Sequence, residues 1–435
     1  MAPATRPTRD RLEQTLAQLD ARAGRERAFV KLYPASARAE ADSSDRRMRE
    51  GRSLGPLDGK IVSIKDLFDI AGEQTLAGSI IRRAAPVAPA DAAIVRRLRA
   101  AGAVIIGKTH MTEFAFTAVG LNPHHPVPGN AIDPALVPGG SSSGAGVSVA
   151  EGTCDIAIGS DTGGSVRIPA ALNGVCGFKP TAARIPLAGA FPLSPSLDSI
   201  GPLAHTVAEC AIADAVMAGD LPQPVVQLQL SGLRVAVPSG RLMEQLDPTI
   251  ESAFAGTCRR LEKAGVQISD IHIDDLLETL AEATRIGSIA GIEASRIHAD
   301  WLADASAPVD GRVASSLRRR LLVPQAAADA LLATRRELVR AMDERLSAVD
   351  IVLLPTTPIG AVPIATVSAD ETTYQHVEGL LLRNTQVANQ FDLTAITLPM
   401  PALARPAGAM LMGRNQTDGF LLRAASAVEA LLRAS

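Results

Sequence analysis

A stretch rich in glycine and serine, residues 138–180, constrains the fold of this chain more than any other feature. It contains two small-residue turns, at 139–144 and 159–165, on either side of a short apolar run at 155–158. Glycine, serine and threonine are the residues that allow a backbone to approach another group closely. The pattern therefore predicts that this backbone lies against either another strand or a reacting substrate.

Apolar runs before this stretch alternate between the strand and the helix pattern. Residues 61–65 and 103–107 are predicted strands, and Asp91 is predicted to cap a helix that ends at Gly102. A further helix is predicted before the first strand, at 9–22. After the stretch, helices are predicted at 206–219, 247–265 and 418–434, and strands at 233–238, 266–273, 351–354, 395–398 and 408–412. This alternation favours an α/β fold with a central sheet flanked by helices.

One segment, residues 274–350, breaks the alternation because nearly all of it follows the helix period. We interpret it as a helical insert that caps a site. No internal repeat and no low-complexity linker divides the 435 residues. The simplest prediction is a single large α/β domain over residues 1–435.

Composition excludes several classes of function. A net charge of −3 and an aromatic content of 3% argue against a nucleic-acid or anionic-membrane partner and against a stacking platform for bases. Four widely spaced cysteines fit neither a zinc site nor a disulfide framework. The polar first ten residues lack a signal core, and the longest uncharged run, residues 351–369, contains three prolines. We expect a protein of the cytoplasm with reduced thiols and no membrane-spanning helix.

The small-residue turns match none of the common nucleotide or hydrolase motifs. They lack the phosphate-binding GxxxxGK[ST], the dinucleotide-binding GxGxxG and the nucleophile elbow GxSxG. A nucleophilic Ser165 would need a general base, and no histidine is indicated by its sequence context. Lys65, at the end of an apolar strand, is the alternative if burial lowers its pKa from about 10.4 to near 7. From Lys65 alone, a solvated lysine at a strand end is the simpler interpretation.

Five phrases taken together change that interpretation. They occur in this order: Pro56-Leu-Asp-Gly59 with Ile64-Lys65-Asp66; Pro138-Gly-Gly-Ser-Ser-Ser-Gly144; Gly159-Ser-Asp-Thr-Gly-Gly-Ser-Val-Arg-Ile-Pro169; Gly177-Phe-Lys-Pro-Thr181; and Leu197-Asp-Ser-Ile-Gly-Pro202. With these phrases the chain resembles the amidase signature family of serine hydrolases, over a signature core of about residues 56–203 and again in the C-terminal segment. The resemblance implies the fold of that family, with a mixed central sheet.

The resemblance also implies a set of catalytic residues. Ser165 is the nucleophile, Lys65 the neutral base and Ser141 the proton relay, held by a cis peptide at Gly140–Ser141. The backbone N–H groups of residues 162–165 (Thr162, Gly163, Gly164 and Ser165) form the oxyanion hole. Asp161 and Arg167 brace this turn, and Ser142 serves loop hydrogen bonds. No cofactor and no metal is implied.

The function implied is hydrolysis of a carboxylic amide C–N bond through an acyl-enzyme. Carbamate (urethane), aryl-acylamide or ester hydrolysis is the alternative within the family. An alternative of another class is the A-type subunit of a tRNA-dependent amidotransferase. Such subunits have glutamine at the position of Ile168, which disfavours this alternative. A third is a catalytically inactive interaction protein, which retention of the three catalytic residues disfavours. We expect a small-molecule substrate, no nucleic-acid or membrane partner, and a homodimer.

The sequence does not identify the substrate. Two departures from the family pattern, Asn130-Ala131 in place of Asn-Pro and a shortened segment at 398–408, affect the pocket rather than the catalytic residues. Five apolar residues are candidates either for a substrate pocket or for the core: Phe114, Phe116, Leu121, Phe191 and Trp301.

Overall fold

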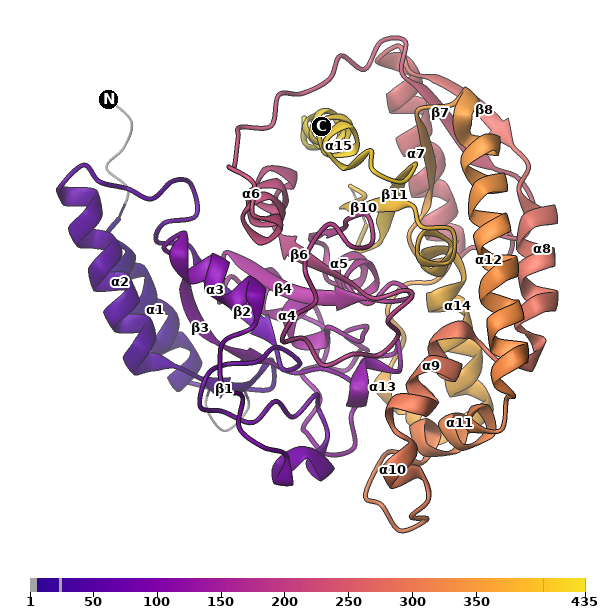
Figure 1. The fold of residues 1–435 in the computed structure, drawn as a ribbon. Coiled ribbons are helices and arrows are strands. Elements are labelled where there is room, and N and C mark those ends of the chain that lie inside the picture. The colour runs from indigo at the N-terminus through magenta and orange to yellow at the C-terminus, as the bar shows by residue number, and fades with distance from the viewer. Residues whose placement is uncertain (1–5, 23–25, 402, 435) are drawn as a thin grey trace.

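A single mixed sheet runs through the protein (Figure 1). The computed structural model describes residues 6–22, 26–401 and 403–434, and within these ranges eleven strands form the sheet in the order β1-β3-β2-β4-β6-β5-β10-β11-β9-β7-β8. The strands are β1 (Phe29–Leu32), β2 (Ile61–Lys65), β3 (Val104–Thr109), β4 (Ile156–Asp161), β5 (Cys176–Lys179), β6 (Ser199–Ala204), β7 (Arg234–Pro238), β8 (Gln267–Ile271), β9 (Ile351–Pro355), β10 (Thr394–Pro399) and β11 (Gly408–Gly413).

Parallel pairing is confined to two groups of strands. β2 runs parallel to β3 and β4, and β7 runs parallel to β8 and β9. The pairs between these groups, from β4 to β9, are antiparallel, as is β1 with β3. Parallel neighbours need crossover connections, and these contain helices such as α3 (Ala93–Ala100), α4 (Ser143–Ala150) and α7 (Pro248–Lys263). The sheet is therefore mixed, in agreement with the prediction.

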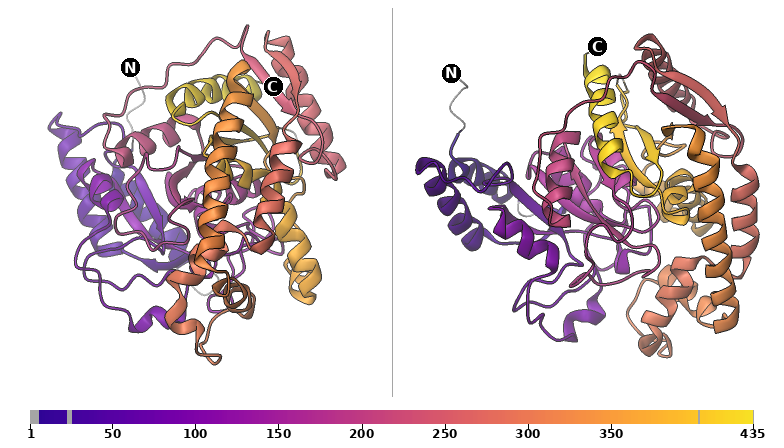
Figure 2. Two further views of the ribbon diagram at one scale, coloured as in Figure 1. Left: turned by 45° about the vertical axis from the view of Figure 1, so that its right-hand side comes forward. Right: turned by 45° about the horizontal axis from the view of Figure 1, so that its top comes forward.

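Helices cover both ends of the sheet. Figure 1 places α1 and α2 beside β1 and β3, and α8 and α12 beside β7 and β8, while the views in Figure 2 show the helices of residues 274–350 as one group. The helices are α1 (Thr8–Asp20), α2 (Pro34–Arg49), α3 (Ala93–Ala100), α4 (Ser143–Ala150), α5 (Arg167–Asn173), α6 (Val207–Ala218), α7 (Pro248–Lys263), α8 (Asp274–Ala283), α9 (Ile289–Ile297), α10 (Ala299–Leu302), α11 (Gly311–Leu321), α12 (Gln325–Arg345), α13 (Ile364–Ala369), α14 (Glu371–Gln390) and α15 (Asp418–Arg433).

The predicted strands and helices are confirmed, with one error at a helix start. Asp91 does not cap α3, because the helix follows Ala92 and has no side-chain cap. The Asp91 carboxylate instead accepts a hydrogen bond from the Ala71 N–H at 2.8 Å and pairs with Arg99. Two long helices, α2 and α14, were not predicted.

Both faces of β2 and β4 are buried. Val62 and Ile64 of β2 pack in the hydrophobic cluster on one face, and Ile61 packs in the cluster on the other. A strand covered on both faces has an uninterrupted apolar sequence. This double coverage also buries Lys65, the last residue of β2.

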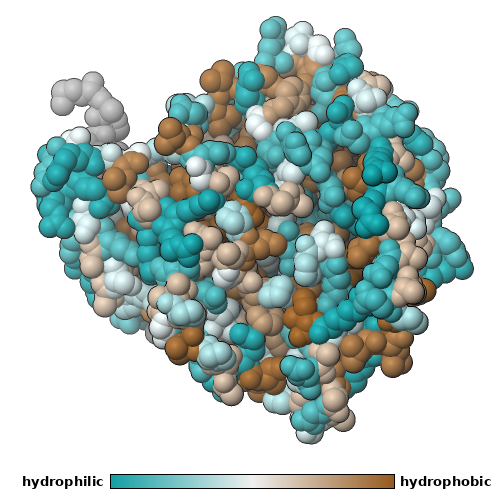
Figure 3. Space-filling model, in the orientation of Figure 1, coloured by the Kyte–Doolittle hydropathy of each residue, from teal (hydrophilic) through white to brown (hydrophobic). Residues whose placement is uncertain are grey.

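No helix in the described ranges is both long and apolar enough to cross a membrane. Figure 3 shows hydrophobic residues scattered among hydrophilic ones over one face of the molecule. All four cysteines are unpaired, as predicted.

Candidate active site

The three predicted catalytic residues lie at one edge of the sheet. Lys65 ends β2, and β4, the parallel neighbour of β2, ends at Asp161 just before the turn that carries Ser165. Ser141 lies two residues before α4. Parallel strands present their carboxyl ends at the same edge, where ligands bind in α/β sheets.

Lys65 is fully buried and bound only by hydroxyl groups. Its Nζ donates to Ser141 Oγ at 2.7 Å and to Ser160 Oγ at 2.8 Å. No carboxylate in the described ranges forms an ion pair with it. Burial lowers the pKa of Lys65 to about 7, against the opposing effect of the charges on Asp161 and Asp198. Near neutral pH a large share of the molecules therefore has a neutral amine here.

Backbone contacts join the two serine turns. The Gly140–Ser141 peptide bond is cis. The Ser142 N–H donates to the Ser165 carbonyl at 3.2 Å, and Ser142 Oγ donates to the Ser160 carbonyl at 3.3 Å. Ser142 thus holds the turn of Ser141 against the turn of Ser165.

The Asp161 carboxylate organises the turn that carries Ser165. Its Oδ1 accepts from the Gly164 N–H at 2.9 Å, and its Oδ2 accepts from the Val166 N–H at 3.1 Å. Gly164 has φ +133°, and a Cβ at this position would overlap Thr385 Oγ1. Glycine is required here for both reasons.

Three backbone donors of this turn are available. In the part of the chain that the structure describes, the N–H groups of Thr162, Gly163 and Ser165 have no acceptor. The Gly164 N–H, which was also predicted for the oxyanion hole, is instead bonded to Asp161. Backbone N–H groups without an acceptor beside a serine are the kind of donor that an oxyanion hole uses.

Arg167 neutralises Asp161 in a fully buried ion pair. Its Nη2 lies 2.8 Å from Asp161 Oδ1 and its Nε 3.0 Å from Oδ2, and neither side chain is exposed. The remaining guanidinium donors reach the Thr385 carbonyl at 2.7 Å and Asn389 Oδ1 at 2.7 Å. Burial alone would raise the pKa of Asp161, but Arg167 outweighs it and lowers the pKa to about 2.

A second carboxylate holds the other side of the turn. Asp198 Oδ1 accepts from Thr162 Oγ1 at 2.6 Å, and its Oδ2 accepts from the Ser194 N–H at 3.0 Å. Glu293 of α9 accepts hydrogen bonds from the hydroxyls of Ser194 and Ser196. The helical insert is therefore connected to the serine turn through this loop.

Comparison with known proteins decides the family. The amidase family model matches residues 10–422. The chain belongs to the amidase signature family. It is 35% identical to 2-amino-5-chloromuconic acid deaminase of Comamonas testosteroni, over 92% of this chain and 87% of the relative. It is 34% identical to the AtzE subunit of 1-carboxybiuret hydrolase from Pseudomonas sp. (strain ADP), over 97% of this chain and 94% of the relative.

Two further likenesses bear on function. The A-type subunit of glutamyl-tRNA(Gln) amidotransferase from Chloroflexus aurantiacus is 33% identical, over 96% of this chain and 92% of that one. A crystal structure of an amidase superimposes with a TM-score of 0.86 at 30% identity, over 98% of this chain and 96% of that one. The predicted membership of the amidase signature family and the predicted fold are confirmed. The chain is a hydrolase of this family that acts on amides.

A cavity opens beside Ser165. It measures about 310 Å³, and Thr162, Gly163 and Ser165 line it. The other walls come from the helices α9, α11 and α14, which supply Gly291, Arg320 and Glu378 among others. Two of these helices belong to the insert at 274–350, which thus forms part of the cavity wall.

The five predicted pocket candidates divide between cavity and core. Phe116 lines the cavity of Ser165. Phe191 lines a neighbouring cavity of about 190 Å³ that also borders Ser160. Phe114 stacks on Trp301 with ring centroids 5.8 Å apart, and Leu121 packs in the core.

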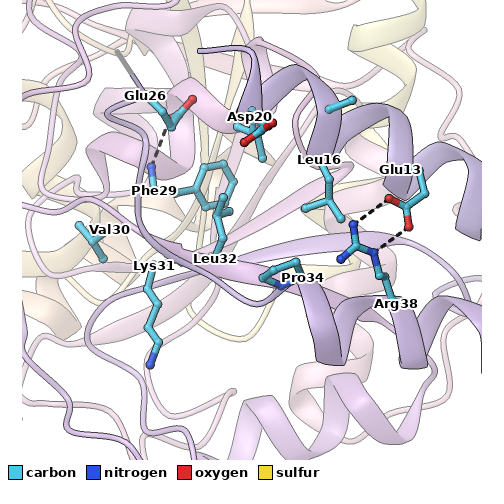
Figure 4. A pocket seen from close by; sticks show the side chains of 12 residues that line it. Glu13, Leu16, Asp20, Glu26, Phe29, Val30, Lys31, Leu32, Pro34 and Arg38 are labelled. Atoms are coloured by element: carbon cyan, nitrogen blue, oxygen red, sulfur yellow. Dashed lines mark hydrogen bonds and ion pairs between the residues drawn. The ribbon is translucent and has the colours of Figure 1, made fainter. Parts of the chain in front are cut away.

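A larger groove lies away from these residues. It measures about 690 Å³, lies between α1, β1 and α2, and is drawn in Figure 4 with Glu13 and Arg38 joined across one side. None of the predicted site residues lines it.

Some contributors to the site were not found from the sequence. Ser160 lies in the third of the five phrases, directly after Gly159, yet its hydrogen bond with Lys65 was not predicted. Thr385 and Asn389 lie four residues apart on α14 and meet Arg167 from a distant part of the chain. No local pattern marks them, because an isolated threonine or asparagine on a helix is common.

The buried ion pair gives a testable prediction. Asp161→Asn leaves the Arg167 charge buried without a counter-charge, so the free energy of unfolding at pH 7 should fall by about 3–5 kcal/mol. Because the pKa of Asp161 is lowered, its contribution is present above the ordinary pKa of about 3.9 and is lost as the pH falls toward 2. Urea unfolding at several pH values measures both effects.

The matched control is Asp350→Asn, which breaks the ion pair of Asp350 with Arg234, a pair that is more exposed than that of Asp161 with Arg167. Exposed pairs contribute about 0–1 kcal/mol, so this change should be small. An Asp161→Asn protein as stable as the control would contradict the role given to the buried pair.

Proposed function

We propose that the chain hydrolyses a carboxylic amide C–N bond through an acyl-enzyme on Ser165. Ser165 Oγ attacks the carbonyl carbon, and its proton passes through Ser141 to the neutral amine of Lys65. The C–N bond then breaks, and the proton returns through Ser141 to the departing nitrogen. Water, activated along the same path, cleaves the resulting ester and regenerates Ser165.

The environment of Lys65 carries this proposal. A buried lysine that donates to Ser141 at 2.7 Å, has no ion-pair partner among the described residues and has a pKa of about 7 meets the requirements of a general base at neutral pH. A solvated lysine would remain charged and unable to accept a proton. The interpretation of Lys65 as an ordinary strand-end lysine is therefore disfavoured.

The nucleophile and its surroundings support the same chemistry. Within the described ranges Ser165 Oγ has no hydrogen-bond partner, and Ser165 borders the cavity. The bond between the Ser142 N–H and the Ser165 carbonyl keeps the two turns adjacent. We assign the oxyanion hole to the N–H groups of Thr162, Gly163 and Ser165, and leave out that of Gly164.

We propose a small-molecule amide as substrate. The names of two relatives, a deaminase and a 1-carboxybiuret hydrolase, support cleavage of carbon–nitrogen bonds. Carbamates, aryl-acylamides and esters remain the alternatives, since the same acyl-enzyme serves them. A homodimer in the cytoplasm, without nucleic-acid or membrane partners, remains a prediction from the sequence.

The A-type subunit of an amidotransferase is the competing proposal from another class. One relative with 33% identity bears that name. Against it stands Ile168, which follows Arg167 where we expect glutamine in such subunits. Glutaminase activity that appears only with a copurifying partner would favour the amidotransferase.

Ser165→Ala should abolish both amide turnover and labelling by a fluorophosphonate, because the attacking oxygen is removed. Ser143→Ala should retain labelling, since the Ser143 hydroxyl donates to the Gly120 carbonyl rather than to Lys65. Mass spectrometry of the labelled protein and thermal unfolding provide the measurements. Retained amide hydrolysis in a folded Ser165→Ala protein would rule out the mechanism.

Lys65→Ala should reduce kcat/KM for amides by at least about 10²-fold. The loss for activated esters should be no larger than the loss for amides. An amide loses both the base and the proton for its leaving group, whereas an activated ester needs only the base. Lys60→Ala is the control, because Lys60 precedes the same strand but pairs with Glu209. A Lys65→Ala protein with wild-type amidase activity would exclude the lysine.

The pH profile of kcat/KM should fall about tenfold per pH unit below about pH 7. Only the neutral amine accepts a proton, and protonation of Lys65 removes it as the pH drops through its pKa of about 7. Glu378, in the same cavity, also has a pKa of about 7, raised by burial. Glu378→Gln should therefore leave the fall of kcat/KM below about pH 7 unchanged. A profile that is flat between pH 5.5 and 8 would be incompatible with this base.

A further inference from the structure

Arg320 lines the cavity that contains Ser165. It belongs to α11 of the helical insert, and the turn of Ser165 lines the same cavity. Among the described residues that line this cavity, Arg320 is the only cation and Glu378 the only carboxylate. The catalytic mechanism uses neither of them.

One edge of the Arg320 guanidinium has no partner. Its Nη1 donates to the Ser316 carbonyl at 2.9 Å and also to Ser316 Oγ. Its Nε is buried and has no acceptor, and no residue in the described ranges accepts from Nη2. The Nε and Nη2 edge is the one that pairs with a carboxylate through two parallel hydrogen bonds. A buried donor without a partner is costly, so this edge favours a ligand that accepts from it.

The backbone of α9 fixes the position of Arg320. Gly291 lies beneath the side chain, and a Cβ at this position would overlap Arg320 Cδ and Nε. Any larger residue at position 291 would displace the guanidinium. The absence of a side chain on Gly291 therefore provides the space in which the arginine lies.

Glu378 does not fully cancel the charge of Arg320. Its carboxylate accepts from the Ala118 N–H at 3.0 Å, and burial raises its pKa to about 7. A large share of Glu378 is therefore protonated at neutral pH. Arg320 stays charged, because a guanidinium does not lose its proton in proteins. The cavity lining thus has an excess of positive charge.

We propose that Arg320 binds an anionic carboxylate of the substrate, and that the substrates are half-amides of dicarboxylic acids. The amide end meets Ser165 and the carboxylate end pairs with the unpartnered Nε and Nη2 edge of the guanidinium. This inference rests on the proposed function for the identity of the reacting end. The binding of the other end can be tested without turnover.

The test measures binding to the Ser165→Ala protein by calorimetry. The ligands are succinamate, glutaramate and adipamate, each compared with the neutral amide of equal chain length: butyramide, pentanamide and hexanamide. At least one carboxylate should bind about 10- to 100-fold more tightly than its neutral counterpart, and the best chain length reports the span from position 165 to Arg320. Adding Arg320→Met should remove that preference and leave the affinity for neutral amides within about threefold.

Three further variants separate binding from folding. Arg319→Met removes an exposed arginine of the same helix and should preserve the preference. Arg320→Lys keeps the charge but loses the two-pronged edge, so it should recover only part of the preference. Gly291→Ala should weaken carboxylate binding although Arg320 is intact.

Two outcomes would overturn the inference: equal affinity for carboxylates and neutral amides, or an Arg320→Met change that weakens both equally. Failure of the proposed function has a different signature, namely that fluorophosphonate does not label Ser165 in the wild-type protein. Labelling without a carboxylate preference would thus reject only the role of Arg320.

Discussion

Burial of Lys65 disfavours the charged form of its amine, and the arrangement of the rest of the site depends on this burial. The apolar faces of β2 place its Nζ out of reach of solvent, and two serine hydroxyls are the groups it binds. Hydroxyls can accept from an amine and also donate to it, so they serve the neutral form as well as the charged one. A carboxylate in the place of Ser160 would stabilise the ammonium form of Lys65 and disfavour the neutral amine.

The Asp161–Arg167 pair protects this arrangement. Asp161 is near enough for its charge to raise the pKa of Lys65, and Arg167 offsets that charge from the other side. The same carboxylate holds the Gly164 and Val166 N–H groups. One residue thus shapes the serine turn, and its partner limits the effect of the Asp161 charge on the Lys65 amine. Neither residue lines the cavity.

The resemblance carried by the five phrases singled out Lys65, Ser141 and Ser165, whereas Lys65 taken alone was an ordinary lysine at a strand end. The structure brings Lys65 and Ser141 together and buries both. Interactions across the fold left no such trace in the sequence. Asn389 and Thr385 bind Arg167 from α14, a helix that was not predicted. The helix α2 was missed because its buried face consists of Ala37, Ala41 and Ser44, which give no apolar stripe. The hydrogen bond from the Gly164 N–H to Asp161 could not be predicted either. Nothing in the sequence distinguishes this N–H group from those of the other three residues of the turn.

The sheet order has a consequence for the newly made chain. β5 pairs with β10, and Arg167 needs acceptors at residues 385 and 389, more than two hundred positions later in the chain. Until α14 has left the ribosome, the first two hundred residues contain Lys65, Ser141 and Ser165, but the Arg167 guanidinium lacks the acceptors at residues 385 and 389. The hydrogen bonds of the site are therefore complete only when nearly the whole chain has been made.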